Sequence, residues 1–141
     1  MTDVTEPAPA PAPRPRRTRG AAESLGSIVL AFESMIAFLG GLAVFGLKAL
    51  PEPIPQWWGI VGGTVLAVVM VLTGRVLRYR WGIALGWVLQ GIVALGGFLV
   101  PALSLVAVIF GGMWGYATIK GASLDARNAR LAAEADTPNG D

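Results

Sequence analysis

The chain has 141 residues, of which 54% are hydrophobic and 14% are charged, and its net charge is +2. So little charge cannot cover the surface of a water-soluble domain of this size, which indicates that much of the chain lies in a lipid bilayer. The sequence contains no cysteine and no histidine. This excludes disulfides and thiolate metal sites, and it removes the commonest general base. We therefore expect an all-α membrane protein that is not an enzyme, holds no metal or cofactor, and binds no nucleic acid.

Residues 1–22 are predicted to form a disordered cytoplasmic arm. Five prolines at alternate positions from 7 to 15 disfavour a helix and favour an extended, polyproline-like chain. The arm also carries four arginines, which either bind anionic headgroups at about 1 kcal/mol each or only fix the orientation in the membrane. We favour the second interpretation. The apolar run that follows is too long for the core of a cleavable signal peptide.

The first two predicted spans cover residues 25–47 and 57–73. The first is long enough to cross a hydrocarbon core of about 30 Å, and the second is near the lower limit of about 17 residues. Between them, Pro51, Pro53 and Pro55 predict a rigid turn. Trp57 and Trp58 follow this turn and suit a membrane–water interface.

Three arginines come after the second span: Arg75, Arg78 and Arg80. They are candidates for contacts to a lipid phosphate or to a cytoplasmic partner. The alternative, which we favour, is that this loop carries only the positive charge that orients a membrane protein.

The next segment, residues 81–119, carries no charge. A single helix of this length would be about twice as long as the bilayer core is thick, so two spans are expected, at 81–98 and 101–119. The glycine pair at 96 and 97 marks the turn between them, and Pro101 is a favourable first residue for a helix. Lys120 and Gly121 are expected to close the last span. The tail, 122–141, is predicted to be partly helical and then disordered.

The positions of the basic residues predict the orientation of this membrane domain, residues 23–121. If both termini are cytoplasmic, four Lys and Arg residues lie in the arm, three in the middle loop and three after Ile119, which leaves only Lys48 outside. The sequence therefore predicts a four-transmembrane-helix bundle in the plasma membrane, with both ends in the cytoplasm.

Small residues recur at four-residue spacing in three of the predicted spans. In lipid, such residues allow helix backbones to approach closely, and this approach can occur within one chain or between copies. We favour packing within one bundle and keep a homo-oligomer interface as the alternative. The positions are Gly59, Gly63 and Ala67, then Gly82 and Gly86, and finally Ala107, Gly111 and Gly115.

Glu33 is an acid near the middle of the first span, about 12 Å from Leu25. An ionised carboxylate that faces lipid costs at least about 2.5 kcal/mol, so Glu33 should face inward, be protonated, or both. Gln90 is expected at nearly the same depth, and its amide can donate or accept a hydrogen bond. The Glu33–Gln90 pair is therefore the candidate intramembrane polar site. It is either a proton or cation site, or an interhelical hydrogen bond worth about 0.6–2 kcal/mol that fixes packing. Lesser partner candidates are Ser34, Thr64, Tyr116 and Thr118.

Trp87 and Trp114 lie inside their spans and are expected to be packing residues, and Gly86 shares a helix face with Gln90. The segments LAFESM, RYRWGIALGWVLQ and GFLVPALSLVAVIFGGMWGYATIKG resemble a family of small actinobacterial integral membrane proteins labelled only as a domain of unknown function. The likeness covers residues 25–121. It implies a four-helix membrane protein, in which the positions matching the family pattern are Glu33, Trp87, Gln90 and Trp114.

Two classes of function follow. One is a non-enzymatic accessory or interaction protein, whose partners are the lipid bilayer and a membrane protein or a second copy of the chain. The other is a proton-coupled small-molecule transporter that uses Glu33. Small multidrug exporters also have four helices and an acid in the first, a likeness of architecture only. Those that assemble as antiparallel dimers need a weak orientation bias, whereas this chain has a strong one. We therefore favour the accessory protein.

Overall fold

The computed structural model describes residues 19–136, and these residues form four helices and no strand. The predicted all-α, four-helix fold is confirmed. Three of the helices are long and apolar enough to cross a membrane, and α3 is shorter, with 17 residues. The helices are α1 (Ala21–Gly46), α2 (Trp58–Val76), α3 (Arg80–Gly96) and α4 (Pro101–Asp136).

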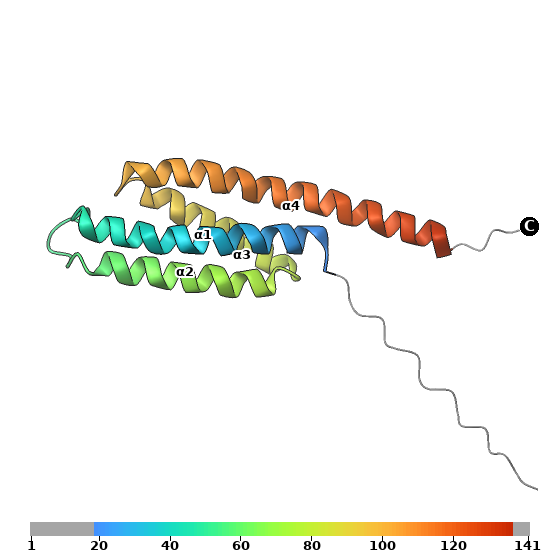
Figure 1. Ribbon diagram of the computed structural model, residues 1–141, viewed down its shortest axis with the longest axis horizontal. Coiled ribbons are helices and arrows are strands. Elements are labelled where there is room, and N and C mark those ends of the chain that lie inside the picture. Colours follow the sequence, from blue (N-terminus) through green and yellow to red (C-terminus); the bar gives the residue numbers. More distant parts are fainter. Residues whose placement is uncertain (1–18, 137–141) are drawn as a thin grey trace, which may run out of the picture.

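The helices pack as a bundle in which α1 is central (Figure 1). It makes its largest interface with α2 and a second one with α4. α3 packs mainly against α4, and α2 and α3 share the smallest of these interfaces. α4 continues well beyond the other helices at the end of the bundle where α1 begins.

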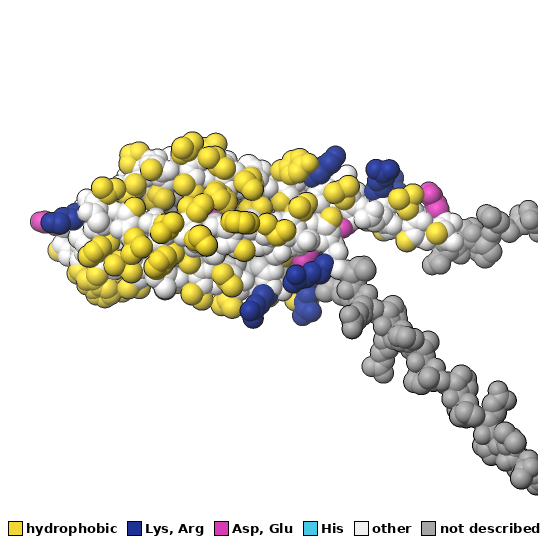
Figure 2. Space-filling view, in the orientation of Figure 1, with side chains coloured by type: hydrophobic (Ala, Val, Ile, Leu, Met, Phe, Trp, Pro, Cys, Tyr) yellow, Lys and Arg dark blue, Asp and Glu magenta, His cyan; other side chains and the backbone are white. Residues whose placement is uncertain are grey.

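The bundle has a small enclosed core and an apolar exterior. Leu30, Met70 and Trp114 are completely buried. In contrast, large side chains such as those of Phe32, Val108 and Phe98 are 63%, 73% and 88% exposed. Hydrophobic side chains cover the bundle, and most of the Lys and Arg side chains gather at the end where α4 protrudes (Figure 2). Such an exterior is unfavourable in water and suits a bilayer.

Glycines set the closest helix–helix approach, between α1 and α2. A Cβ atom added at Gly41 would lie 2.5 Å from the carbonyl oxygen of Gly59 and 2.8 Å from the Cα of Gly63. Real Cβ atoms do not approach other atoms this closely. The two backbones can therefore meet only because Gly41, Gly59 and Gly63 have no side chain. Gly59 and Gly63, two of the small residues noted in the second span, therefore pack within the bundle.

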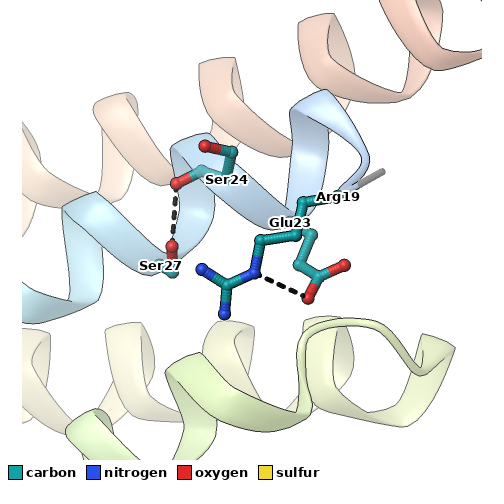
Figure 3. Close-up of polar contacts among 4 residues, drawn as sticks. All are labelled: Arg19, Glu23, Ser24 and Ser27. Carbon is teal, nitrogen blue, oxygen red and sulfur yellow. Dashed lines mark hydrogen bonds and ion pairs between the residues drawn. The ribbon is translucent and has the colours of Figure 1, made fainter. Parts of the chain in front are cut away.

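The start of α1 is held by polar contacts from both ends of the chain. Arg19 Nε lies 3.5 Å from Glu23 Oε1, and the Ser27 hydroxyl donates a 2.8 Å hydrogen bond to the carbonyl oxygen of Ser24 (Figure 3). Gly20, at the N-cap, has no side chain to accept a hydrogen bond. The carboxylate of Asp125, on α4, takes this role: it accepts hydrogen bonds from the backbone N–H groups of Ala21 and Ala22.

Two helices extend past the limits expected for their spans. α4 does not end at Lys120 and Gly121 but continues to Asp136. Gly121 lies inside the helix and does not stop it. A Cβ at this position would clash with the Cα of Ala22, so the glycine permits close contact between α4 and α1. Residues 21 and 22 likewise belong to α1 and not to the N-terminal arm. The remainder of the predicted arm, 1–18, and the last five residues, 137–141, lie outside the described residues.

The other boundaries shift by a few residues. α2 ends at Val76, three residues after the expected limit. α3 ends at Gly96, because residues 97–100 form the turn that precedes Pro101.

Candidate functional site

The middle of the bundle contains the polar pair proposed from the sequence. Glu33 on α1 is 0% exposed, and Gln90 on α3 is 6% exposed. The Gln90 Nε2 group donates a hydrogen bond to Glu33 Oε2, at a donor–acceptor distance of 2.5 Å. The structure thus brings together two residues that lie 57 positions apart in the chain and that the sequence placed at one depth.

Trp114 of α4 is completely buried in the same bundle interior, about one helical turn along α3 from Gln90. A Cβ added at Gly86, one helical turn before Gln90, would lie 2.0 Å from Cζ2 of the indole. A Cβ at Gly26 of α1 would lie 3.3 Å from Cζ3 of the same ring. The indole is therefore enclosed between α1 and α3, and the glycines on those two helices make room for it.

Glu33, Gln90 and Trp114 are buried polar side chains from three different helices, and we call these three residues the polar layer. Gln90 Oε1 also faces α4, because it lies 3.8 Å from the position of a Cβ on Gly111, one turn from Trp114. Each member of the polar layer has one buried atom without a hydrogen-bond partner in the described part of the chain. These atoms are Glu33 Oε1, Gln90 Oε1 and Trp114 Nε1.

Several other hydroxyl groups in the spans donate hydrogen bonds within their own helices. The Ser34 hydroxyl donates to the carbonyl oxygen of Ala31 at 2.7 Å, and the Thr73 hydroxyl donates to that of Val69 at 2.7 Å. Of the lesser candidates, Thr64 and Thr118 also donate to carbonyls of their own helices, and Tyr116 is 66% exposed. Gln90 is therefore the residue that the structure pairs with Glu33.

The chemistry open to the polar layer is limited. Within residues 19–136, no group of three or more Asp, Glu, His or Cys side chains is placed to hold a metal ion. The layer offers a carboxyl group, an amide and an indole N–H, which can exchange hydrogen bonds or a proton. Its arrangement suits a hydrogen-bonded link between helices.

Trp87 differs from Trp114. Its side chain is 49% exposed, and its ring edge lies 3.6 Å from the position of a Cβ on Gly115. It packs across the surface of α4 and does not enter the polar layer. Both tryptophans lie in apolar spans, and the sequence contains no signal that separates the enclosed one from the exposed one.

The three arginines near the turn between α2 and α3 are exposed and lie away from the polar layer. The guanidinium of Arg78 stands 4.4 Å from the centre of the Tyr79 ring, a cation–π contact. Arg75 and Arg80 lie at the end of α2 and the start of α3. Contact of these arginines with lipid phosphates stays a prediction.

Comparison with known protein families identifies the family to which the chain is similar. A family model described as a protein of unknown function, DUF4233, matches residues 24–130. This range includes nearly all of α1, the whole of α2 and α3, and α4 as far as Arg130. No curated protein and no solved structure matches. The matched range contains the polar layer and also Asp125, which caps α1.

Proposed function

The chain belongs to the DUF4233 family of proteins of unknown function. We propose that it is a non-enzymatic accessory protein of an actinobacterial cytoplasmic membrane. In this proposal, all four helices cross the bilayer, both termini face the cytoplasm, and the protein acts through contact with another membrane protein. The gathering of basic side chains at one end of the bundle supports this orientation (Figure 2).

The burial of Glu33 is the main observation that supports an accessory role over a transport role. Its side chain is completely buried and accepts a hydrogen bond from Gln90. An acid that carries protons across a membrane must exchange them with both sides, whereas an acid that links two helices works best when enclosed. In this proposal, the Glu33–Gln90 bond fixes α3 against α1, two helices that share little other contact.

The composition supports the absence of an enzymatic role. The sequence has no histidine and no cysteine. The polar layer contains one carboxyl group, without a base or nucleophile hydrogen-bonded to it. Hydrolysis or group transfer on a lipid would need at least one of these partners.

The protruding end of α4 is the proposed contact surface. Residues 126–136 extend the helix past the start of α1 by about 15 Å at 1.5 Å per residue. Arg127, Arg130, Leu131 and Glu134 are exposed along this extension. A mixed surface of both charges and an apolar side chain suits a partner outside the hydrocarbon core.

Crosslinking in native membranes tests this function. A photoreactive amino acid at Leu131 should give one discrete crosslinked complex with another membrane protein. The same probe at Val108, which is 73% exposed on the apolar part of α4, should react with lipid. Crosslinks at Leu131 to lipid alone would contradict the proposal.

One observation favours the alternative of a proton-coupled small-molecule transporter. Glu33 Oε1 has no hydrogen-bond partner among the described residues, so half of the carboxyl group is not committed to packing. If this alternative holds, the purified protein in liposomes will show substrate flux linked to a proton gradient. That flux will vanish in Glu33→Gln, which keeps the shape of the side chain and removes its titration.

A further inference from the structure

An apolar groove of about 390 Å³ opens where α2 and α3 separate. All four helices contribute to it, and none of the residues that line it is charged. It lies in the half of the bundle that carries the loop between α1 and α2. This groove is separate from the polar layer and from the α4 extension.

Glycine creates much of this space. Gly62 of α2 lines the groove, and a Cβ added there would meet nothing within 4 Å. Leu66 and Leu103 line the groove with larger apolar side chains. The groove therefore has an apolar lining that suits a hydrocarbon ligand, and it offers no group that would recognise a charged one.

The depth of the groove matches one leaflet of a bilayer. Along α2, its lining runs from Trp58 to Leu66, about 12 Å at 1.5 Å per residue. Half of a hydrocarbon core of about 30 Å is about 15 Å. The shallow end lies at the stacked rings of Trp57 and Trp58, whose centroids are 4.8 Å apart, and such residues favour the membrane interface.

The deep end of the groove lies near mid-membrane. Ala37 and Val93 line it there, about one helical turn beyond Glu33 and Gln90. A partner helix or a second copy of the chain would pack along the full height of the core. The groove stops halfway, as a lipid chain from one leaflet does.

We propose that this groove binds one acyl chain of a phospholipid from the leaflet on the side of the α1–α2 loop. The headgroup then lies at the level of Trp57 and Trp58, and the chain end approaches the layer of Glu33 and Gln90. The bound lipid fills the space between α2 and α3, which follow each other in the chain but share only a small interface.

Two leucine substitutions in the full chain test the proposal. Gly62→Leu fills the groove without a clash, since a Cβ at this position meets no atom within 4 Å. Gly91→Leu is the matched control, because a Cβ at Gly91 also meets nothing and this glycine does not line the groove. Both variants should keep the helical content and the detergent-unfolding midpoint of the unmodified protein.

Native mass spectrometry after extensive detergent washing measures the bound phospholipid. The unmodified protein and Gly91→Leu should each retain one phospholipid per chain. Gly62→Leu should retain it about tenfold less, because overpacking by one side chain shifts a binding equilibrium by on the order of a decade. Equal retention in the two variants, or none in the unmodified protein, would overturn the proposal.

A phospholipid with a photoreactive acyl chain provides a second measurement in liposomes. Its crosslinks should concentrate at groove residues such as Ala37 and Val93 and disappear from them in Gly62→Leu, while crosslinks at Val108 persist. If Gly62→Leu instead changes the oligomeric mass, a second copy occupies the groove and the lipid proposal is wrong. The mass-spectrometry and crosslinking results do not depend on whether the probe at Leu131 finds a partner protein, so the lipid proposal and the proposed function can fail separately.

Discussion

The carboxylate of Asp125 accepts a hydrogen bond from the backbone N–H of Ala21, so the last helix caps the first across 104 positions of the chain. It accepts a second, at 3.2 Å, from Ala22. The first N–H groups of a helix have no partner within the helix, and a negative charge there also favours the helix dipole. This contact ties the C-terminal part of α4 to the start of α1.

Removal of this cap should destabilise the protein. Asp125→Ala is expected to lower the free energy of unfolding by about 0.5–2 kcal/mol, the usual range for a lost N-cap. Asp125→Asn keeps one acceptor and should lose less. The measurement is unfolding by SDS in mixed micelles. Glu134→Ala, an exposed acid on the same helix, is the control and should change stability little. Equal effects of Asp125→Ala and Glu134→Ala would rule out the cap.

The link between Glu33 and Gln90 predicts a measurable coupling energy. In a double-mutant cycle with Glu33→Ala and Gln90→Ala, we expect about 0.6–2 kcal/mol of coupling in the free energy of unfolding. A parallel cycle with Ser34→Ala and Gln90→Ala should give almost none, because Ser34 bonds to its own helix. Strictly additive effects of the Glu33 and Gln90 substitutions would show that the bond does not stabilise the bundle.

Neighbouring glycines on α2 should respond in opposite ways to alanine. Gly63→Ala should destabilise the protein by about 1–3 kcal/mol, because its methyl group would lie 2.7 Å from the Cα of Gly41. Gly62→Ala meets no atom within 4 Å and should be neutral or stabilising by up to about 1 kcal/mol. Thermal unfolding in detergent, followed by circular dichroism, compares the two. A loss of stability in Gly62→Ala as large as that in Gly63→Ala would contradict the packing described here.

The C-terminus of α1 contains a lysine where glycine is usual. Lys48 has φ of 50°, and the N–H of Ala49 donates to the carbonyl oxygen of Val44, which closes a Schellman motif. Lys48→Gly should raise the free energy of unfolding by about 0.5–1 kcal/mol, because glycine adopts this conformation without a Cβ penalty. The same SDS titration measures this gain, and a loss of stability would argue against the motif.

Much of the fold follows from the sequence, because charge and proline bound the apolar segments. The four helices and the depth of Glu33 and Gln90 could be predicted from spacing alone, since a helix rises by a fixed distance per residue. The length of α4 could not. Gly121 resembles a helix stop in the sequence, but in the structure it allows contact with Ala22.

Other features depend on how the helices are placed in space. The Asp125 cap joins residues far apart in the chain, and no local pattern signals it. Trp87 and Trp114 look alike in the sequence, because in lipid an exposed tryptophan and an enclosed one are both surrounded by apolar groups. The groove beside Gly62 arises from the separation of α2 and α3, which hydropathy does not encode.

Labelling of single cysteines in intact cells tests the central claim, that four helices cross the bilayer with both ends in the cytoplasm. The chain has no native cysteine, so each introduced one reports a single position. Glu52→Cys and Phe98→Cys should react with a membrane-impermeant maleimide from outside, whereas Arg78→Cys and Asn128→Cys should react only after permeabilisation. Arg78 and Phe98 flank α3, the shortest helix, and so report directly on whether it crosses. Labelling of Asn128→Cys from outside, or of Arg78→Cys and Phe98→Cys from the same side, would contradict the account.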